Sequence, residues 1–292
     1  MVALALFGVV GLATLRSLDR QARFHAGMLT ILEARAQHAA AHEAIATELR
    51  SVASAAGDIT RLSDSAIVFR LPVGAGVACA LASDTIYLTP DTVAAGQRFA
   101  GFRTTPQAGD TVWLFNESAT DLGADDAWVG MLVTSINRAP GLCTGSSLVN
   151  PALDASQPSW RIAVAGPLPP TAQAGAPVHL TRTARFALYR GGTSEHWLGF
   201  TEIQPTTGTW ITIQPVSGPY LPFNAGTPST SGMSLLGTDS SGTPLLPSSA
   251  TLAWAISLST RTRTTRSVRM DGLAPGVYGD SLHSLIHLRN AR

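Results

Sequence analysis

The pattern of apolar and polar residues divides the chain near Gly57. Residues 1–56 contain no proline and three glycines, whereas the rest of the chain holds all 18 prolines and the other 24 glycines. Proline and glycine interrupt helices and mark turns. Alanine, the best helix former, is frequent from Ala34 onward. The sequence therefore predicts an α+β protein, with one long helix over residues 1–56 stopped by Gly57 and a mostly antiparallel, β-rich head over residues 57–292.

The first half of this helix is uniformly apolar, because the first charged side chain is Arg16. The apolar half consists of Met1, Val2, Ala3, Leu4, Ala5, Leu6, Phe7, Gly8, Val9, Val10, Gly11, Leu12, Ala13, Thr14 and Leu15. A membrane-spanning helix needs about 20 apolar residues, and this segment has fewer. It does not read as a signal peptide, because no basic residue precedes it and no Ala-x-Ala pattern follows. We expect the apolar segment to begin upstream of Met1 and to lie in a membrane or in the core of a filament.

The second half of the helix is amphipathic. Two neighbouring rows repeat every seven residues, and their members are Phe24, Ile31, His38, Ile45 and Val52 in one and Met28, Arg35, His42 and Leu49 in the other. The rows are apolar at both ends and polar in the middle, which is not the pattern of a plain coiled coil. We expect Ile45, Leu49 and Val52 to pack the helix on the head, and the stretch from Arg35 to His42 to be more exposed.

The head is predicted from short runs of β-branched and aromatic residues separated by turn residues. The predicted strands are Ser65–Leu71, Val77–Leu81, Thr85–Thr89, Thr111–Phe115, Trp128–Ile136, Trp160–Val164, His179–Tyr189, Trp197–Ile203, Thr209–Gln214, Ser234–Gly237 and Leu252–Leu258. In the last and clearest of them, Leu252, Trp254, Ile256 and Leu258 share one face. A segment rich in Pro, Ala and Gly at 166–177 suggests two subdomains, 57–165 and 178–292.

The two cysteines, Cys79 and Cys143, both lie in the β-rich part. In an exported protein such a pair forms a disulfide, whereas in the cytosol it more often stays reduced. The apolar N-terminus points to export, so we expect a Cys79–Cys143 disulfide. The loop-entropy model gives such a bond roughly 4 kcal/mol of stabilisation.

The opening residues MVALALFG, Met1 to Gly8, resemble the N-terminal segment of type IV prepilins. In that family a leader ends in Gly, and the mature chain opens Phe-Thr-Leu-(Ile/Leu)-Glu before a run such as Leu-Leu-Val-Ala-Leu-Ala-Leu-Phe-Gly. The succession of apolar helix, amphipathic helix and β-rich head is similar too, as is the ending Ile286 to Asn290. Length and strand content are closest to the larger minor pilins of the PilW type and to J-type pseudopilins. Because Met1 falls about six residues into the mature pattern, the leader Gly, the N-terminal Phe that the family methylates and the following Glu are missing from the sequence.

The resemblance implies a non-catalytic structural subunit of a type IV pilus or of a type II secretion-like filament, without a cofactor. Its location would be the bacterial inner membrane, with the head in the periplasm, and then a cell-surface or periplasmic filament. Its partners would be other pilin or pseudopilin subunits and the inner-membrane assembly platform. An apolar helix moves from bilayer to filament core at little cost, since both environments hide the same side chains. The alternative is a membrane-anchored β-domain protein of the cell envelope that binds a ligand without polymerising.

Two patterns suggest chemistry that we do not expect. Gly141-Leu142-Cys143-Thr144-Gly145 matches a nucleophile elbow with Cys in place of Ser, but Pro151 and Pro158 follow it where that motif needs a helix. His38 and His42 have the spacing of a metal clip on a helix without an evident third ligand, so we interpret them as solvated helix surface. A net charge of +1 argues against a nucleic-acid partner. We therefore predict no catalytic, cofactor-binding or metal-binding residue.

Overall fold

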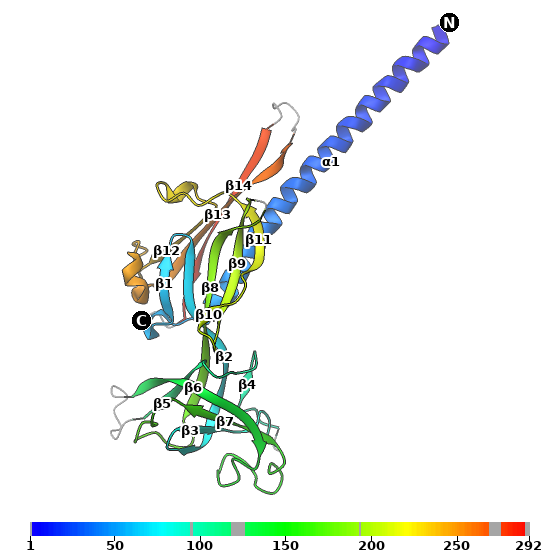
Figure 1. Ribbon diagram of the computed structural model, residues 1–292. Helices are drawn as coiled ribbons and strands as arrows, with labels where there is room; N and C mark the ends of the chain where they lie inside the picture. Colours follow the sequence, from blue (N-terminus) through cyan, green and yellow to red (C-terminus); the bar gives the residue numbers. More distant parts are fainter. Residues whose placement is uncertain (1, 94–95, 118–125, 193, 269–275, 290–292) are drawn as a thin grey trace. The chain divides into compact units, whose positions relative to one another are not determined.

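The computed structural model describes residues 2–93, 96–117, 126–192, 194–268 and 276–289 (Figure 1). A long N-terminal helix is followed by strands whose described pairings are antiparallel. This arrangement confirms the predicted α+β class. The chain forms two compact units that alternate along the sequence. Unit 1 comprises Met1–Val68, Phe186–Phe200 and Gln214–Arg292, and unit 2 comprises Phe69–Arg185 and Thr201–Ile213. The predicted separator at 166–177 falls inside unit 2.

Helix α1 (Val2–Leu49) is shorter than the predicted 1–56. After it the hydroxyl of Ser51 donates to the carbonyl of Glu48 at 2.8 Å, and such local side-chain bonds compete with continued helix. A 3-10 turn, η1 (Ser54–Ala56), follows. Gly57 has a φ of 75° and closes this turn, so it is a stop signal as predicted, but for η1 and not for α1.

Unit 1 places the C-terminal half of α1 against strands β11 (Gln214–Tyr220), β13 (Ala255–Val268) and β14 (Gly276–His287). Strands β12 (Met233–Thr238), β13 and β14 form a three-stranded antiparallel sheet, and β11 pairs with β9 (His196–Gln204). The elements that lie in unit 1 are α1, η1, β1 (Ile59–Ser63), β11 (Gln214–Tyr220), η2 (Pro228–Thr230), β12 (Met233–Thr238), η3 (Pro247–Leu252), β13 (Ala255–Val268) and β14 (Gly276–His287).

The predicted strand Leu252–Leu258 is wrong in its first half. Pro247 begins the 3-10 helix η3, which runs to Leu252, and β13 starts only at Ala255. Proline is favoured in a first helical turn, and this signal overrides the alternation of apolar residues that follows. Consequently Trp254 is 39% exposed, while Ile256 and Leu258 are fully buried.

Unit 2 is a closed antiparallel barrel. Its strand order is β2-β3-β7-β6-β5-β8, and β8 pairs with β2 to complete the ring. Strands β2 (Ala66–Ala82), β8 (Pro177–Arg190) and β9 (His196–Gln204) contribute residues to both units; the others are β3 (Thr85–Leu88), β4 (Gly101–Phe102), β5 (Thr111–Asn116), β6 (Ala127–Pro140), β7 (Pro158–Val164) and β10 (Thr209–Trp210). The barrel interior is filled by aliphatic side chains such as Ile86, Leu114 and Ile162, all fully buried. The predicted strands Ser65–Leu71 and Val77–Leu81 belong to one strand, β2, which begins at Ala66.

Candidate assembly surface and the docking seam of helix α1

The N-terminal half of α1 is exposed and carries several large apolar side chains. Every residue from Phe7 to Ala26 is exposed, and Phe7 has 83% of its surface accessible. Its large apolar side chains are Phe7, Val9, Val10, Leu12, Leu15, Leu18 and Phe24. Contiguous apolar patches of this kind mark interaction sites, because soluble monomers rarely leave them uncovered. Of the predicted membrane or filament-core residues, Met1 lies outside the described residues, as do the side chains of Val2 to Leu6.

Among the described residues, no helix combines the length and the mean hydropathy that crossing a membrane requires.

The C-terminal half of α1 is docked on the strands of unit 1. Ile45 and Leu49 are fully buried, and Val52, just past the helix, is 1% exposed. Ile31 is also buried, one turn before Arg35. The three residues predicted to pack the helix on the head are therefore all buried, and the docked stretch extends further toward the N-terminus than expected.

His38 and His42 correct the sequence prediction of a solvated helix surface. Their exposed fractions are 2% and 7%, and both face a polar part of β13 and β14. Nδ1 of His38 lies 2.7 Å from Oγ1 of Thr260, and Nε2 of His42 lies 2.9 Å from the same oxygen. Nδ1 of His42 lies 2.6 Å from Oγ of Ser284. Because the Thr260 hydroxyl has one proton, it donates to one imidazole and accepts from the other.

Burial favours the neutral form of both imidazoles. Desolvation lowers the pKa of His38, although the negative charge of Asp280 opposes this effect. For His42 desolvation, together with the nearby His38 and His283, lowers the pKa to about 4. Nε2 of His38 is buried and has no hydrogen-bond partner within the described part of the chain. Both rings are thus neutral at pH 7. Neutral imidazoles can be buried against the sheet because its hydroxyl groups form hydrogen bonds with them.

Two further polar contacts fix the register of α1 on unit 1. Gln37 accepts a hydrogen bond from the amide of Gly218 at 3.0 Å through its side chain, and from the hydroxyl of Tyr220 at 2.8 Å through its backbone carbonyl. Two residues earlier Arg35 pairs with Asp280, with Nε 3.2 Å from Oδ2. The polar middle of the helix therefore meets polar partners at successive levels, which fixes one register better than apolar contacts alone.

The sequence contained a signal for this seam in β13. Its inward-facing residues change from Ile256 and Leu258 to Thr260, Thr262 and Thr264, all buried. On the strand, aliphatic side chains are followed by hydroxyl side chains. On the helix face, the histidines precede the apolar Ile45, so polar groups of one element match polar groups of the other. The sequence of the helix or of β13 alone does not reveal this match. Only a comparison of the two sequence patterns would have predicted the contact.

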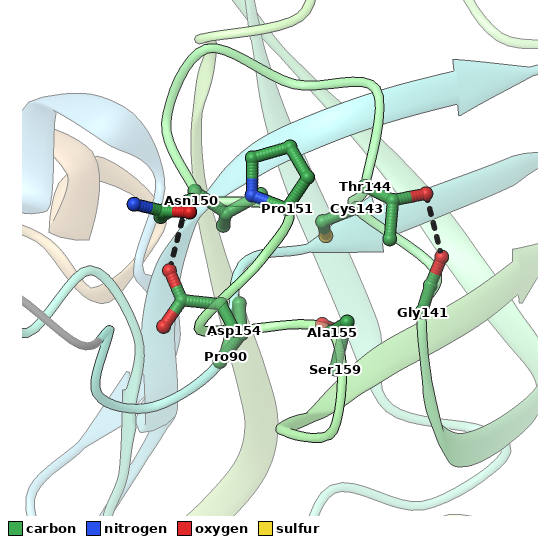
Figure 2. Close-up of a pocket in the computed structure, with 10 residues that line it drawn as sticks. Pro90, Gly141, Cys143, Thr144, Asn150, Pro151, Asp154, Ala155 and Ser159 are labelled. Atoms are coloured by element: carbon green, nitrogen blue, oxygen red, sulfur yellow. Dashed lines mark hydrogen bonds between the residues drawn. The ribbon is translucent and has the colours of Figure 1, made fainter.

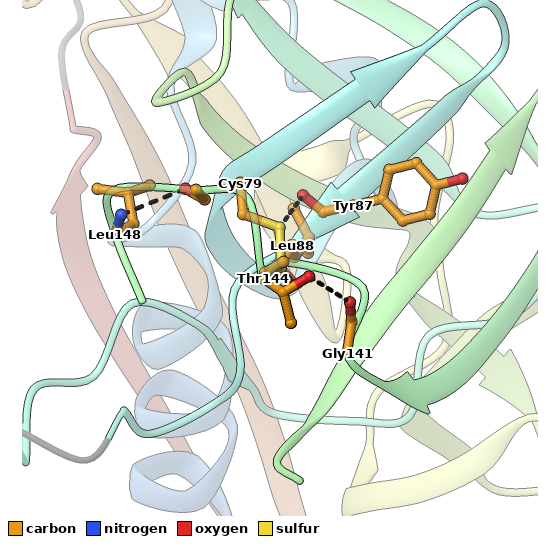
Figure 3. Close-up of a disulfide and its surroundings, with 8 residues drawn as sticks. Cys79, Tyr87, Leu88, Gly141, Thr144 and Leu148 are labelled. Atoms are coloured by element: carbon orange, nitrogen blue, oxygen red, sulfur yellow. Dashed lines mark hydrogen bonds between the residues drawn. A yellow bond between two sulfur atoms is a disulfide. The ribbon is translucent and has the colours of Figure 1, made fainter. Parts of the chain in front are cut away.

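The disulfide predicted between Cys79 and Cys143 is present in unit 2 (Figure 3). The two Cα atoms are 5.5 Å apart, in the usual range for such a bond. Because Cys143 is bonded to Cys79, it is not a free thiol, and Gly141 to Gly145 form a turn without the helix that a nucleophile elbow requires. The disulfide indicates an extracytoplasmic location.

A small hollow lies beside this disulfide (Figure 2). Asp154 borders it and accepts a hydrogen bond from the amide of Asn150 at 2.7 Å, so its carboxylate organises the loop that forms the wall. In the part of the chain that the structure describes, no three His, Cys, Asp or Glu side chains gather as metal ligands would.

Comparison with protein-family models, with curated proteins and with solved structures finds no match for the chain. Its description therefore rests on its own fold: a long N-terminal helix with an exposed apolar half, followed by an antiparallel β-rich head.

Proposed function

We propose that the chain is a non-catalytic assembly subunit, of the minor pilin or pseudopilin kind, in a type IV pilus or type II secretion-like filament. The observation that carries the proposal is the division of α1 into two halves. Residues 7–26 leave large apolar side chains exposed, while His38 to Leu49 are clamped on unit 1. A helix held at one end and apolar at the other is suited to lateral packing with like helices.

The MVALALFG resemblance and the disulfide support the same proposal. The subunit would be held in the bacterial inner membrane with its head in the periplasm, and then enter a cell-surface or periplasmic filament. Its partners would be other pilin or pseudopilin subunits and the inner-membrane assembly platform. Packing is the whole mechanism, and no residue acts as a catalyst.

The test compares two aspartate substitutions in full-length chains expressed in cells that assemble such filaments. Leu12→Asp changes a 51% exposed residue of the apolar half, and Leu246→Asp changes a 72% exposed residue of unit 1. A carboxylate in a helical core without water is costly, so Leu12→Asp should be missing from sheared filaments and from the assembly complex. Leu246→Asp should be present like the wild type. Equal incorporation of both variants contradicts the proposal, as does a wild type absent from both fractions.

A second candidate is a membrane-anchored β-domain protein that binds a ligand in the cell envelope without polymerising. The outer face of the barrel favours it, because Trp128 on β6 is 44% exposed. Its ring lies 4.4 Å from that of His179 and 5.4 Å from that of Phe115, which makes an aromatic surface on unit 2. For this candidate, substitution of Trp128 abolishes ligand binding, and Leu12→Asp leaves the chain in the envelope without affecting any filament.

A further inference from the structure

Three arginines form a stripe directly after the apolar half of α1. Arg16, Arg20 and Arg23 are all exposed. At 3.6 residues per turn, positions i, i+4 and i+7 lie within about 60° of one another around a helix. Asp19 at the edge of the stripe pairs with Arg23, with Oδ2 2.7 Å from Nη2. Three arginines and one aspartate leave two net positive charges on residues 16–23.

The stripe continues the docked face of α1 but is itself uncovered. Gly27 and Ile31 are buried on the same side of the helix, so this side is covered from Gly27 onward. Before Gly27 the side is open. In the other direction it continues into Val9 and Leu12, which are 67% and 51% exposed. A partner of this surface must therefore offer apolar groups to the residues before Arg16 and anionic groups to the stripe of Arg16, Arg20 and Arg23.

The length of the stripe is close to the thickness of the headgroup region on one side of a bilayer. With a rise of 1.5 Å per residue, the stripe covers about 10 Å directly after the apolar residues. One leaflet has about 15 Å of hydrocarbon, and its headgroup region is about 5 to 8 Å thick. When the apolar residues lie in the hydrocarbon, the stripe that follows them directly lies at the depth of the phosphates.

We propose that Arg16, Arg20 and Arg23 bind the phosphates of anionic phospholipids while the apolar half of α1 lies in the hydrocarbon. This inference rests on the proposed function, in which the helix is stored in a membrane before assembly. Guanidinium groups bind phosphate oxygens in a bidentate way, and arginine stems lie easily along apolar surface. Each basic residue near an anionic surface strengthens binding by about 5-fold, so the stripe contributes about 100-fold.

The experiment measures partition of the full chain, purified in mild detergent and diluted, onto two kinds of vesicle. One kind is pure phosphatidylcholine, and the other contains 30% phosphatidylglycerol. The triple variant Arg16→Gln, Arg20→Gln, Arg23→Gln is compared with a control of equal charge change, Arg50→Gln, Arg61→Gln, Arg263→Gln, whose arginines are also exposed in unit 1. The stripe variant should lose up to about 100-fold in binding to the anionic vesicles, and the control should stay within about 3-fold.

Three results overturn the inference. The first is that the wild type binds both kinds of vesicle equally. The second is that the stripe variant and the control variant lose the same amount of binding to the anionic vesicles. The third is that the stripe variant keeps its vesicle binding but is no longer incorporated into filaments. The last result assigns the stripe to an acidic protein partner. Failure of the proposed function is distinguishable, because the vesicle difference then persists while the wild-type chain is absent from sheared filaments and from the assembly complex.

Discussion

Acidification should release the docked half of α1 because it charges two imidazoles that the fold buries. The pKa of His42 is about 4 in the folded chain, against an ordinary value of 6.5, and its side chain is 7% exposed. Since the folded state binds this proton less tightly than the unfolded state, the stabilisation is complete above pH 6.5. It is lost as the pH falls from 6.5 through 4. At 1.36 kcal/mol per pH unit the loss at the acid end is about 3 kcal/mol.

The groups around His42 modify this loss without reversing it. His38 has a lowered pKa as well, so its protonation acts in the same direction. His283 adds repulsion once it is charged, and Asp280 attracts the imidazolium of His38 but is already paired with Arg35. The double variant His38→Gln, His42→Gln retains amide groups for Thr260 and Ser284 and has no proton to gain.

Hydrogen exchange of the backbone amides in residues 38–49, corrected for the intrinsic exchange rate, measures the opening of this segment at pH 7 and at pH 4. The wild type should lose protection about 100-fold more than the double variant over this range, which corresponds to about 3 kcal/mol. Parallel pH dependence in the two chains refutes the reasoning, since other carboxylates titrate equally in both.

Two further perturbations test the packing of each unit. Ile45→Ala removes a fully buried side chain of the docked helix and should reduce the free energy of unfolding of unit 1, measured by urea titration, by about 2 to 4 kcal/mol. The control Leu32→Ala, at a 53% exposed position, should change this free energy by less than about 0.5 kcal/mol. The double variant Cys79→Ala, Cys143→Ala opens a loop between cysteines 64 positions apart and should destabilise unit 2 by about 3 to 4 kcal/mol, measured by barrel tryptophan fluorescence; an unchanged urea midpoint contradicts this.

Much of the fold was predictable because local signals agreed with the tertiary structure. The absence of proline before residue 57 predicted the helix, and β-branched runs predicted most of the barrel strands. The end of α1 was misplaced because no glycine or proline near Leu49 marks the stop in the sequence. The start of β13 was misplaced because Pro247 favours a 3-10 turn over the alternation that includes Trp254.

The seam at His38 and His42 was missed for a different reason. A polar residue on a helix face normally meets water, and the sequence of α1 alone does not reveal that Thr260 and Ser284 lie opposite. Burial of these imidazoles depends on a contact between residues more than 200 positions apart. The exposed apolar half was easier to predict, since fifteen consecutive uncharged residues need no partner to be recognised.

The most direct test of helix packing is oxidative cross-linking of Leu12→Cys in assembling cells. Both native cysteines are bonded to each other, so the new thiol is the reactive one. The partner is another helix-bearing subunit that carries an engineered cysteine at the matching level of its helix. We predict that Leu12→Cys forms a disulfide with this partner through α1 and that Leu246→Cys does not. Cross-linking of Leu12→Cys that stays at the level of Leu246→Cys, in cells where filaments form, contradicts the packing of α1 among like helices.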